Sequence, residues 1–413
     1  MKTFLLLALI IIFALGVRFY NFNNRINFGP EQAISLITSG EYIQEKFSLL
    51  GIRNLQRVTS QGHVIFSGAL FTYTLVPLQL IFNFDPLPIT GYFAVLNILT
   101  GLALFFAALK IFNLKIAFFS TVLFLFNDFM INHSLFIWIV NYLPILNIGI
   151  VYLLYKHKEK EKTFYVFLIG LLVGISFGLE YIYLFTAVLV FGILLWISKK
   201  RISITLFFLI GAALGNFPML LFDFKHDYYH LRVLWQYFLD TIGNPVQSLI
   251  SYYHFLHFWP LFALFGGLVI SFIYKKNKFL ALFLIALYIS LNLISPRISF
   301  NEAIGMSKDL KYPTVEATAK VIAGDKPEKF NVAALLDFDS RAHPLRYLLK
   351  YRYGLNPMGI EEYPESETLY VLTKSDYDII ASKTWEIDSF RPFSLDILKA
   401  IDKQYTVYKL TKP

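Results

Sequence analysis

Apolar segments of span length alternate with short polar loops over residues 1–296. A helix that crosses the hydrocarbon core of a bilayer needs roughly 20 apolar residues. The pattern predicts an all-α polytopic membrane protein with about nine transmembrane helices, together with interfacial or re-entrant helices. The expected spans are 4–16, 92–111, 115–132, 136–155, 164–179, 181–197, 202–222, 257–274 and 279–295.

The basic residues of the loops predict the orientation. Lysines and arginines gather at 110–115, 156–162, 199–201 and 275–278. The positive-inside rule places such loops in the cytoplasm. All four loops and the N-terminus satisfy the rule together only if the apolar stretch Phe66 to Phe82 does not cross the bilayer, so we expect that stretch to lie in the outer interface or to re-enter. No small-x-small cleavage site follows the first apolar run, which favours an uncleaved first helix. The outer regions are then 19–91, 223–256 and the tail after Arg297.

The pattern changes after Pro296. It predicts helices at 313–323 and 343–353, and strands at 330–336, 368–373 and 405–410. We therefore expect two domains. Residues 1–296 form the membrane domain, and residues 297–413 form a small extracytoplasmic α/β domain.

Composition narrows the class of protein. Hydrophobic residues make up 56% of the chain and the mean hydropathy is +0.56, which excludes a water-soluble protein. The net charge of +9 follows from the basic loops, so it indicates topology and not a nucleic-acid partner. There is no cysteine, which excludes a disulfide framework and a thiolate nucleophile.

Several ionisable residues stand at the ends of spans that would face the outer side. Such groups are costly near lipid and often mark a site. Glu180 interrupts the apolar stretch 164–197, so two short helices must turn there. The glycines at 170, 174 and 178 would let a neighbouring backbone approach closely. Glu31 follows Pro30 at the start of an amphipathic run, where an acid is also favourable to a helix dipole.

Several short motifs occur in order along the first 240 residues. They are Phe28-Gly29-Pro30-Glu31-Gln32-Ala33, Thr59-Ser60-Gln61-Gly62, Phe66-Ser67-Gly68-Ala69-Leu70-Phe71-Thr72-Tyr73, Trp138-Ile139-Val140-Asn141-Tyr142-Leu143-Pro144, the Glu180 turn, and Gly215-Asn216-Phe217-Pro218 running into Phe222-Asp223-Phe224-Lys225-His226. The set resembles the GT-C glycosyltransferases related to the dolichyl-phosphate-mannose-protein mannosyltransferases. Two positions depart from that pattern. Glu31 stands where the family has its catalytic aspartate, and Gly68-Ala69 replaces a Gly-Pro pair.

The resemblance implies transfer of a sugar from a polyprenyl phosphate to a hydroxyl of a lipid, glycan or protein acceptor, with inversion, at the outer face of the plasma membrane. Such a reaction needs a carboxylate that takes the acceptor proton and cations that stabilise the leaving phosphate. Glu31 is the candidate base and Glu180 the second acid. Arg53 and Arg57 would share one face of a helix and could hold the phosphate.

The remaining candidates come from other outer segments. Lys225 and His226 are further phosphate-binding candidates, and the weaker site candidates are Gln32, Asp128, His133, Asn141 and Asp223. The sequence leaves open whether the protein needs a divalent cation, Mg²⁺ or Mn²⁺. Its oxygen ligands would come from Glu31, Glu180 or Asp223. The isolated Asp337-Phe338-Asp339 is a weak metal motif.

Three alternatives stay open. A transporter or lipid flippase also has many spans with buried acids. An O-antigen ligase or polymerase would need a longer late outer loop than residues 223–256. The glutamate in place of aspartate is compatible with a catalytically silent GT-C homologue.

Overall fold

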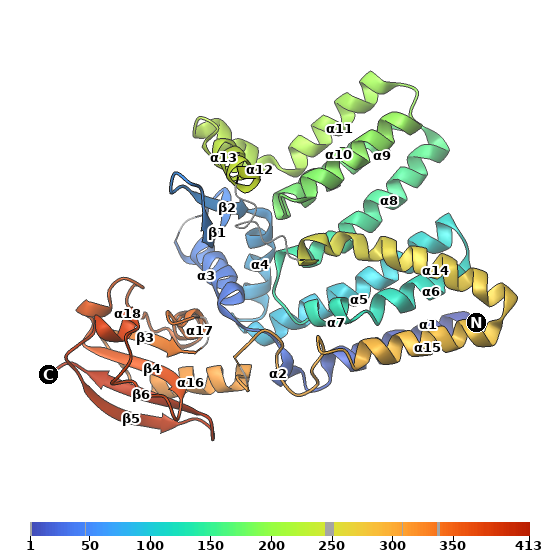
Figure 1. Ribbon diagram of the computed structural model, residues 1–413. Coiled ribbons are helices and arrows are strands. Elements are labelled where there is room, and N and C mark those ends of the chain that lie inside the picture. Colours follow the sequence, from blue (N-terminus) through green and yellow to red (C-terminus); the bar gives the residue numbers. More distant parts are fainter. Residues whose placement is uncertain (1, 46, 244–251, 308, 337–338) are drawn as a thin grey trace.

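The computed structural model describes residues 2–45, 47–243, 252–307, 309–336 and 339–413. A bundle of apolar helices carries a small mixed domain at one end (Figure 1). The helices of the bundle are α1 (Lys2–Phe19), α5 (Pro86–Ile111), α6 (Leu114–Leu125), α7 (Asp128–His133), α8 (Leu143–Lys160), α9 (Thr163–Leu179), α10 (Tyr183–Ile197), α11 (Arg201–Gly215), α12 (Phe217–Lys225), α13 (Tyr229–Gly243), α14 (Trp259–Lys276) and α15 (Lys278–Leu293). The 3₁₀ turns η1 (Ile139–Tyr142) and η3 (Tyr252–Phe258) precede α8 and α14.

Helices lie at each predicted span, but the predicted number of nine is not confirmed. Among the described residues, three helical units are long and apolar enough to cross a membrane: Pro86–Ile111, Ile139–Lys160 and Tyr252–Lys276. The bent pair α11 and α12 would make a fourth. The other apolar helices are shorter, with apolar stretches of 10–17 residues, such as Leu5–Phe19 within α1.

Two predicted spans are not continuous helices. The span 115–132 is divided between α6 and α7, because Asn127 leaves the helix and its side chain caps α7 by accepting the Met130 N–H. The span 202–222 bends by 79° between α11 and α12. Asn216 leaves helical geometry there, and Pro218 has no N–H to continue the ladder.

The glycine spacing of α9 does allow the predicted close approach, and the partner is α11. A Cβ on Gly174 would lie 2.1 Å from the Ala212 carbonyl oxygen, and one on Gly170 would lie 2.2 Å from the Phe208 oxygen. The contact is reciprocal, because a Cβ on Gly211 would lie 2.2 Å from the Phe167 oxygen. The two helices therefore touch backbone to backbone.

The basic turns share one end of the bundle. The turns α5–α6, α8–α9, α10–α11 and α14–α15 lie with the N-terminus at the end remote from the C-terminal domain (Figure 1). This grouping is the one that the charge pattern requires. The side of the membrane on which this end lies stays a prediction.

The segment between α1 and α5, which the sequence predicts to lie outside, consists of short elements. It contains α2 (Phe22–Arg25), α3 (Pro30–Gln44), the antiparallel hairpin of β1 (Leu50–Val58) and β2 (Val64–Gly68), and α4 (Leu70–Ile81). The apolar stretch 66–82 is thus the end of a strand followed by a helix of 12 residues. At a rise of about 1.5 Å per residue, α4 is shorter than a bilayer core of about 30 Å.

The C-terminal region has the predicted α/β character. Its sheet has the order β3-β4-β6-β5, with β3 (Phe330–Leu335) parallel to β4 (Thr368–Lys374), and with β6 (Tyr405–Thr411) antiparallel to its neighbours. Helices α16 (Tyr312–Gly324) and α17 (His343–Tyr353) pack beside it. The sequence pattern did not predict β5 (Ser394–Ala400), an edge strand that is mostly exposed and carries a register shift.

Helix α17 packs against α3 and so connects the C-terminal region to the first part of the chain. The Tyr351 hydroxyl donates to the Ile37 carbonyl at 3.2 Å, and the Tyr351 ring lies where a side chain on Gly40 would be. Lys350 pairs with Glu45 at 3.2 Å. The small domain is therefore held against the helix whose first turn carries Glu31.

Candidate functional site

Glu31 lies in the first turn of α3. Gly29 is extended and Pro30 occupies the first helical position, which fixes the helix start. The Gly29 N–H donates to the Gln32 side-chain oxygen at 3.2 Å and to that of Asn27 at 3.1 Å. Buried Gln32 therefore caps the helix, whereas the neighbouring Glu31 points outward and is exposed.

The Glu31 carboxylate has no hydrogen-bond or ion-pair partner within the described part of the chain. More than a third of its surface is accessible, yet surrounding protein removes part of its hydration and raises the pKa of the carboxyl. A general base needs an unpaired carboxylate with a raised pKa that the substrate can reach. The exposed Glu31 carboxylate has these properties.

Glu180 lies at the predicted break between α9 and α10. Its Oε2 is 3.0 Å from His254 Nδ1, and its Oε1 accepts the Ile182 N–H at 3.4 Å. His254 comes from η3, and its other ring nitrogen is buried with no partner among the described residues. The sequence pattern did not single out His254, because its contact with Glu180 joins residues 74 positions apart.

The β1–β2 hairpin packs against this break. A Cβ on Gly68 would lie 2.1 Å from the Gly178 carbonyl oxygen, so β2 ends directly against the last turn of α9. The Tyr181 hydroxyl donates to the Phe66 carbonyl at 2.6 Å and is 3.0 Å from His230 Nε2. The break, β2 and α13 thus form one contiguous unit beside Glu180.

Three of the weaker candidates have structural partners. Asp128 accepts from Ser295 at 2.6 Å and pairs with Arg297 at 3.3 Å, which ties α7 to the chain after α15. Asp223 caps α13 by accepting the N–H groups of residues 230 and 231. Asn141 donates to the carbonyls of residues 133 and 136.

His133 is a different case. It is 5% exposed, and neither ring nitrogen has a partner among the described residues. Its ring stacks on Phe136 with the centroids 5.4 Å apart, and it lies near Tyr252 and Tyr253. The contacts of His133 are therefore aromatic, and it does not meet Glu31 or Glu180 in any contact of the described residues.

The candidate cations are spread over two elements. Arg53 and Arg57 belong to strand β1, so the expectation of a shared helical face is wrong. Four residues of extended chain span roughly 13 Å, against about 6 Å on a helix. Arg53 is exposed, while the Arg57 side chain lies outside the described part of the structure. Lys225 ends α12 in an exposed position, and His226 stacks on Phe222 at 4.1 Å.

Two arginines that look like ordinary flanking charges in the sequence are buried. Arg18 is 0% exposed and donates to Asn97 at 2.7 Å and to the Leu125 carbonyl at 2.9 Å. Arg25 is 2% exposed and donates to the carbonyls of Ser299 and Val17 at 2.6 and 2.7 Å. They hold the first helix against its neighbours.

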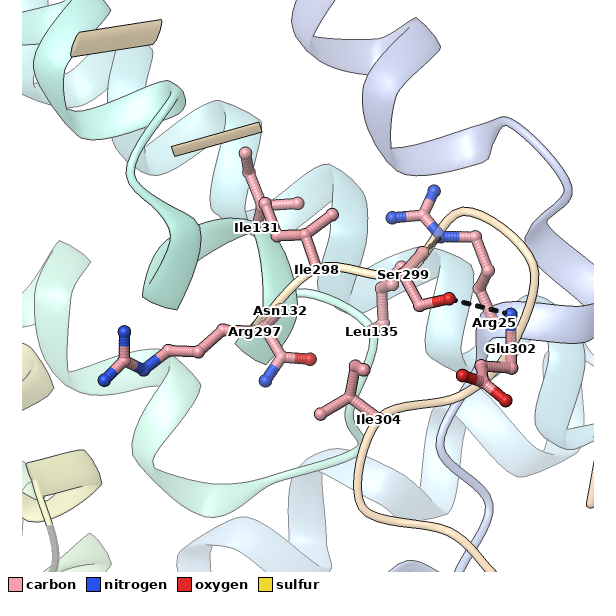
Figure 2. Close-up of a pocket in the computed structure, with 9 residues that line it drawn as sticks. All are labelled: Arg25, Ile131, Asn132, Leu135, Arg297, Ile298, Ser299, Glu302 and Ile304. Carbon is pink, nitrogen blue, oxygen red and sulfur yellow. Dashed lines mark hydrogen bonds between the residues drawn. The ribbon is translucent and has the colours of Figure 1, made fainter. Parts of the chain in front are cut away.

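A pocket near the junction with the tail contains two arginines (Figure 2). Arg25, Arg297, Asn132 and Glu302 line it, and the Glu302 N–H donates to Ser299 Oγ at 3.2 Å. The Arg25 head is occupied by carbonyls and the Arg297 head by Asp128. The donors of Arg25 are therefore taken up inside the protein, whereas the Arg297 side chain pairs with Asp128 and stays half-exposed.

The described residues contain no group of three or more His, Asp or Glu side chains arranged to hold a metal ion. Asp339 accepts from the backbone and the ring of His343, each at 2.8 Å, and so caps α17. Residues 337 and 338 of the Asp-x-Asp motif lie outside the described residues.

Known proteins resemble this chain in three-dimensional structure but not detectably in sequence. No protein-family model matches the chain, and no curated protein matches its sequence. The crystal structure of ArnT from Cupriavidus metallidurans in the apo state matches with a TM-score of 0.57 and 11% identity, over 99% of this chain and 98% of that chain. ArnT bound to undecaprenyl phosphate matches with a TM-score of 0.55 and 11% identity, over 98% and 97% of the two chains.

The match to ArnT extends over nearly the whole of both chains. It shows that this protein has the GT-C fold, as the ordered motifs indicated. The identity of 11% limits this finding to the fold.

Proposed function

We propose that this protein is a membrane glycosyltransferase that transfers a sugar from a polyprenyl-phosphate donor to an acceptor hydroxyl. The observation that carries the proposal is Glu31, an unpaired carboxylate with a raised pKa in the first turn of α3. The GT-C fold supports it, as does the crystal structure in which the similar protein ArnT is bound to undecaprenyl phosphate. The ordered motifs favour the branch related to the protein mannosyltransferases.

In the proposed reaction, Glu31 takes the proton of the acceptor hydroxyl while that oxygen attacks the anomeric carbon. The bond between this carbon and the phosphate oxygen breaks, polyprenyl phosphate leaves, and the anomeric configuration inverts. A raised pKa makes the carboxylate a stronger proton acceptor. Glu180, oriented by His254, is the proposed second acid.

The leaving phosphate needs positive charge, for which Arg53, Arg57, Lys225 and His226 are the proposed sources. The acceptor is a lipid, glycan or protein hydroxyl. We place the reaction at the outer face of the plasma membrane, with the C-terminal domain on the same side. This placement rests on the grouping of the basic turns at the opposite end of the bundle.

The test is replacement of Glu31 by glutamine, assayed with a panel of polyprenyl-phosphate sugars. The amide keeps the shape but cannot take a proton, so we expect transfer to fall by about 10² or more. Glu31→Asp should keep part of the activity. Glu41→Gln is the matched control, because Glu41 lies in the same helix and burial also raises its pKa.

The control should transfer sugar at the wild-type rate. Full activity of Glu31→Gln would remove Glu31 from the mechanism. A wild-type protein that transfers no sugar of the panel, although it binds the lipids, would favour a silent homologue.

A further inference from the structure

The segment that joins α7 to η1 turns at residues 134 and 135 and then runs extended to Trp138. Side chains alternate along an extended chain, so residues two apart share a face. Leu135 and Ile137 are 4% and 1% exposed, whereas Phe136 and Trp138 are both half-buried. Leu135 lines the arginine pocket behind the segment (Figure 2). Phe136 and Trp138 therefore form an aromatic face on the other side.

A second segment extends this face. The Trp138 and Tyr253 rings have centroids 5.6 Å apart at 70°, and the Phe136 and Trp138 rings have centroids 6.3 Å apart at 82°. Tyr253 belongs to η3 and is also half-buried. Two segments far apart in the chain thus contribute one aromatic surface, formed by Phe136, Trp138 and Tyr253.

Each end of the aromatic surface adjoins an element that carries a candidate carboxylate. At one end, Asn27 pairs with residues 135 and 136 through a hydrogen bond of 3.1 Å and a parallel bridge. The Asn27 side chain in turn accepts the Gly29 N–H at the start of α3, two residues before Glu31. At the other end, Tyr253 precedes His254, whose ring lies 3.0 Å from Glu180.

We propose that the aromatic surface binds a hexopyranose ring between Glu31 and Glu180, with Trp138 as its main contact. This inference rests on the proposed function. A pyranose ring has faces of C–H groups edged by hydroxyls, which suits an aromatic wall flanked by polar groups at both ends. The ring can belong to the lipid-linked donor or to a glycan acceptor.

The experiment measures binding to purified protein, so that it does not depend on catalysis. The probes are farnesyl-phosphate sugars carrying different hexoses, farnesyl phosphate itself, and a panel of methyl hexopyranosides added with farnesyl phosphate. The affinity ratio of the sugar-bearing lipid to farnesyl phosphate isolates what the sugar contributes. Wild type should favour at least one sugar-bearing lipid or bind at least one methyl hexopyranoside.

Trp138→Ala should reduce the sugar contribution about tenfold, which corresponds to about 1.4 kcal/mol for one aromatic contact. Trp138→Phe should keep part of it. Trp196→Ala is the control, because Trp196 is 84% exposed near the basic end of α10. Affinity for farnesyl phosphate alone should stay unchanged in all three variants, which also shows that they fold.

The outcomes separate the two sources of sugar. Loss of the preference for the sugar-bearing lipid assigns the aromatic surface to the donor, and loss of methyl hexopyranoside binding assigns it to the acceptor. Unchanged sugar binding in Trp138→Ala overturns the inference, as does a wild type that binds no sugar probe. The binding assay involves no sugar transfer, so full activity of Glu31→Gln would overturn the catalytic proposal and leave the result for the aromatic surface standing.

Discussion

At the scale of single residues, Glu31 combines a candidate catalytic role with a cost in stability. Burial raises its pKa in the folded protein above that of the unfolded chain. Between the two pKa values the folded state binds more protons, so stability falls as the pH rises through this window. Glu31→Gln cannot ionise, and we expect it to unfold about 1–2 °C above wild type at pH 7–8.

The difference between Glu31→Gln and wild type should shrink as the pH falls toward the usual glutamate range. Thermal unfolding of the detergent-solubilised protein, followed by tryptophan fluorescence from pH 4.5 to 8, measures it. A constant difference over this range would mean that the Glu31 carboxyl is not desolvated.

The arginines of β1 give a second prediction at this scale. If they hold the donor phosphate, Arg53→Ala and Arg57→Ala should raise the donor KM, and lysine should rescue only in part because its head cannot bind two oxygens in a fixed plane. Since a strand separates the two positions by roughly 13 Å, we expect one arginine to dominate. Unchanged donor KM in both alanine variants would transfer the phosphate site to Lys225 or His226.

At the scale of elements, the contact between α9 and α11 depends on glycine. A side chain at Gly174 meets the Ala212 backbone at 2.1 Å, and that backbone cannot move without separating the helices. Gly174→Val should therefore destabilise the protein by about 1–3 kcal/mol or more. Gly192→Val is the control, because nothing lies within 4 Å of a Cβ there.

The fraction of protein that stays monodisperse after heating, measured by size-exclusion chromatography, compares the two glycine variants. Equal survival of Gly174→Val and Gly192→Val would contradict the backbone contact. If the monodisperse fraction falls only in Gly174→Val, the destabilisation lies at the α9–α11 interface.

The apolar helices and three of the four strands of the C-terminal sheet could be predicted because hydrophobic spacing is a local signal, whereas the β1–β2 hairpin and β5 were not predicted. The break at Glu180 and the glycine face of α9 are local signals of the same kind. The breaks at Asn127 and Asn216 depend on polar contacts and bends that an apolar run of span length does not reveal. His254, Trp138 and the buried Arg18 and Arg25 gain their roles from partners far along the chain, which one sequence does not indicate.

At the scale of the whole molecule, the basic turns and the candidate catalytic residue Glu31 lie at opposite ends of the helix bundle. The basic turns lie at one end of the bundle, and α3, the β1–β2 hairpin and the C-terminal domain lie at the other (Figure 1). The contact of Tyr351 with α3 makes the small domain a support for the helix that carries Glu31. A reaction at the outer face requires that this second end be extracytoplasmic.

The chain contains no cysteine, so single cysteines report the orientation without background. Lys158 lies in the last turn of α8 at the basic end, and Lys399 lies on the exposed edge strand β5. With a membrane-impermeant maleimide on intact cells, Lys399→Cys should be labelled at once and Lys158→Cys only after permeabilisation. Labelling of Lys158→Cys from outside would invert the topology and place Glu31 in the cytoplasm. Labelling of both would show instead that the two ends lie on one side, which requires an even number of crossings between them and contradicts the arrangement of the bundle.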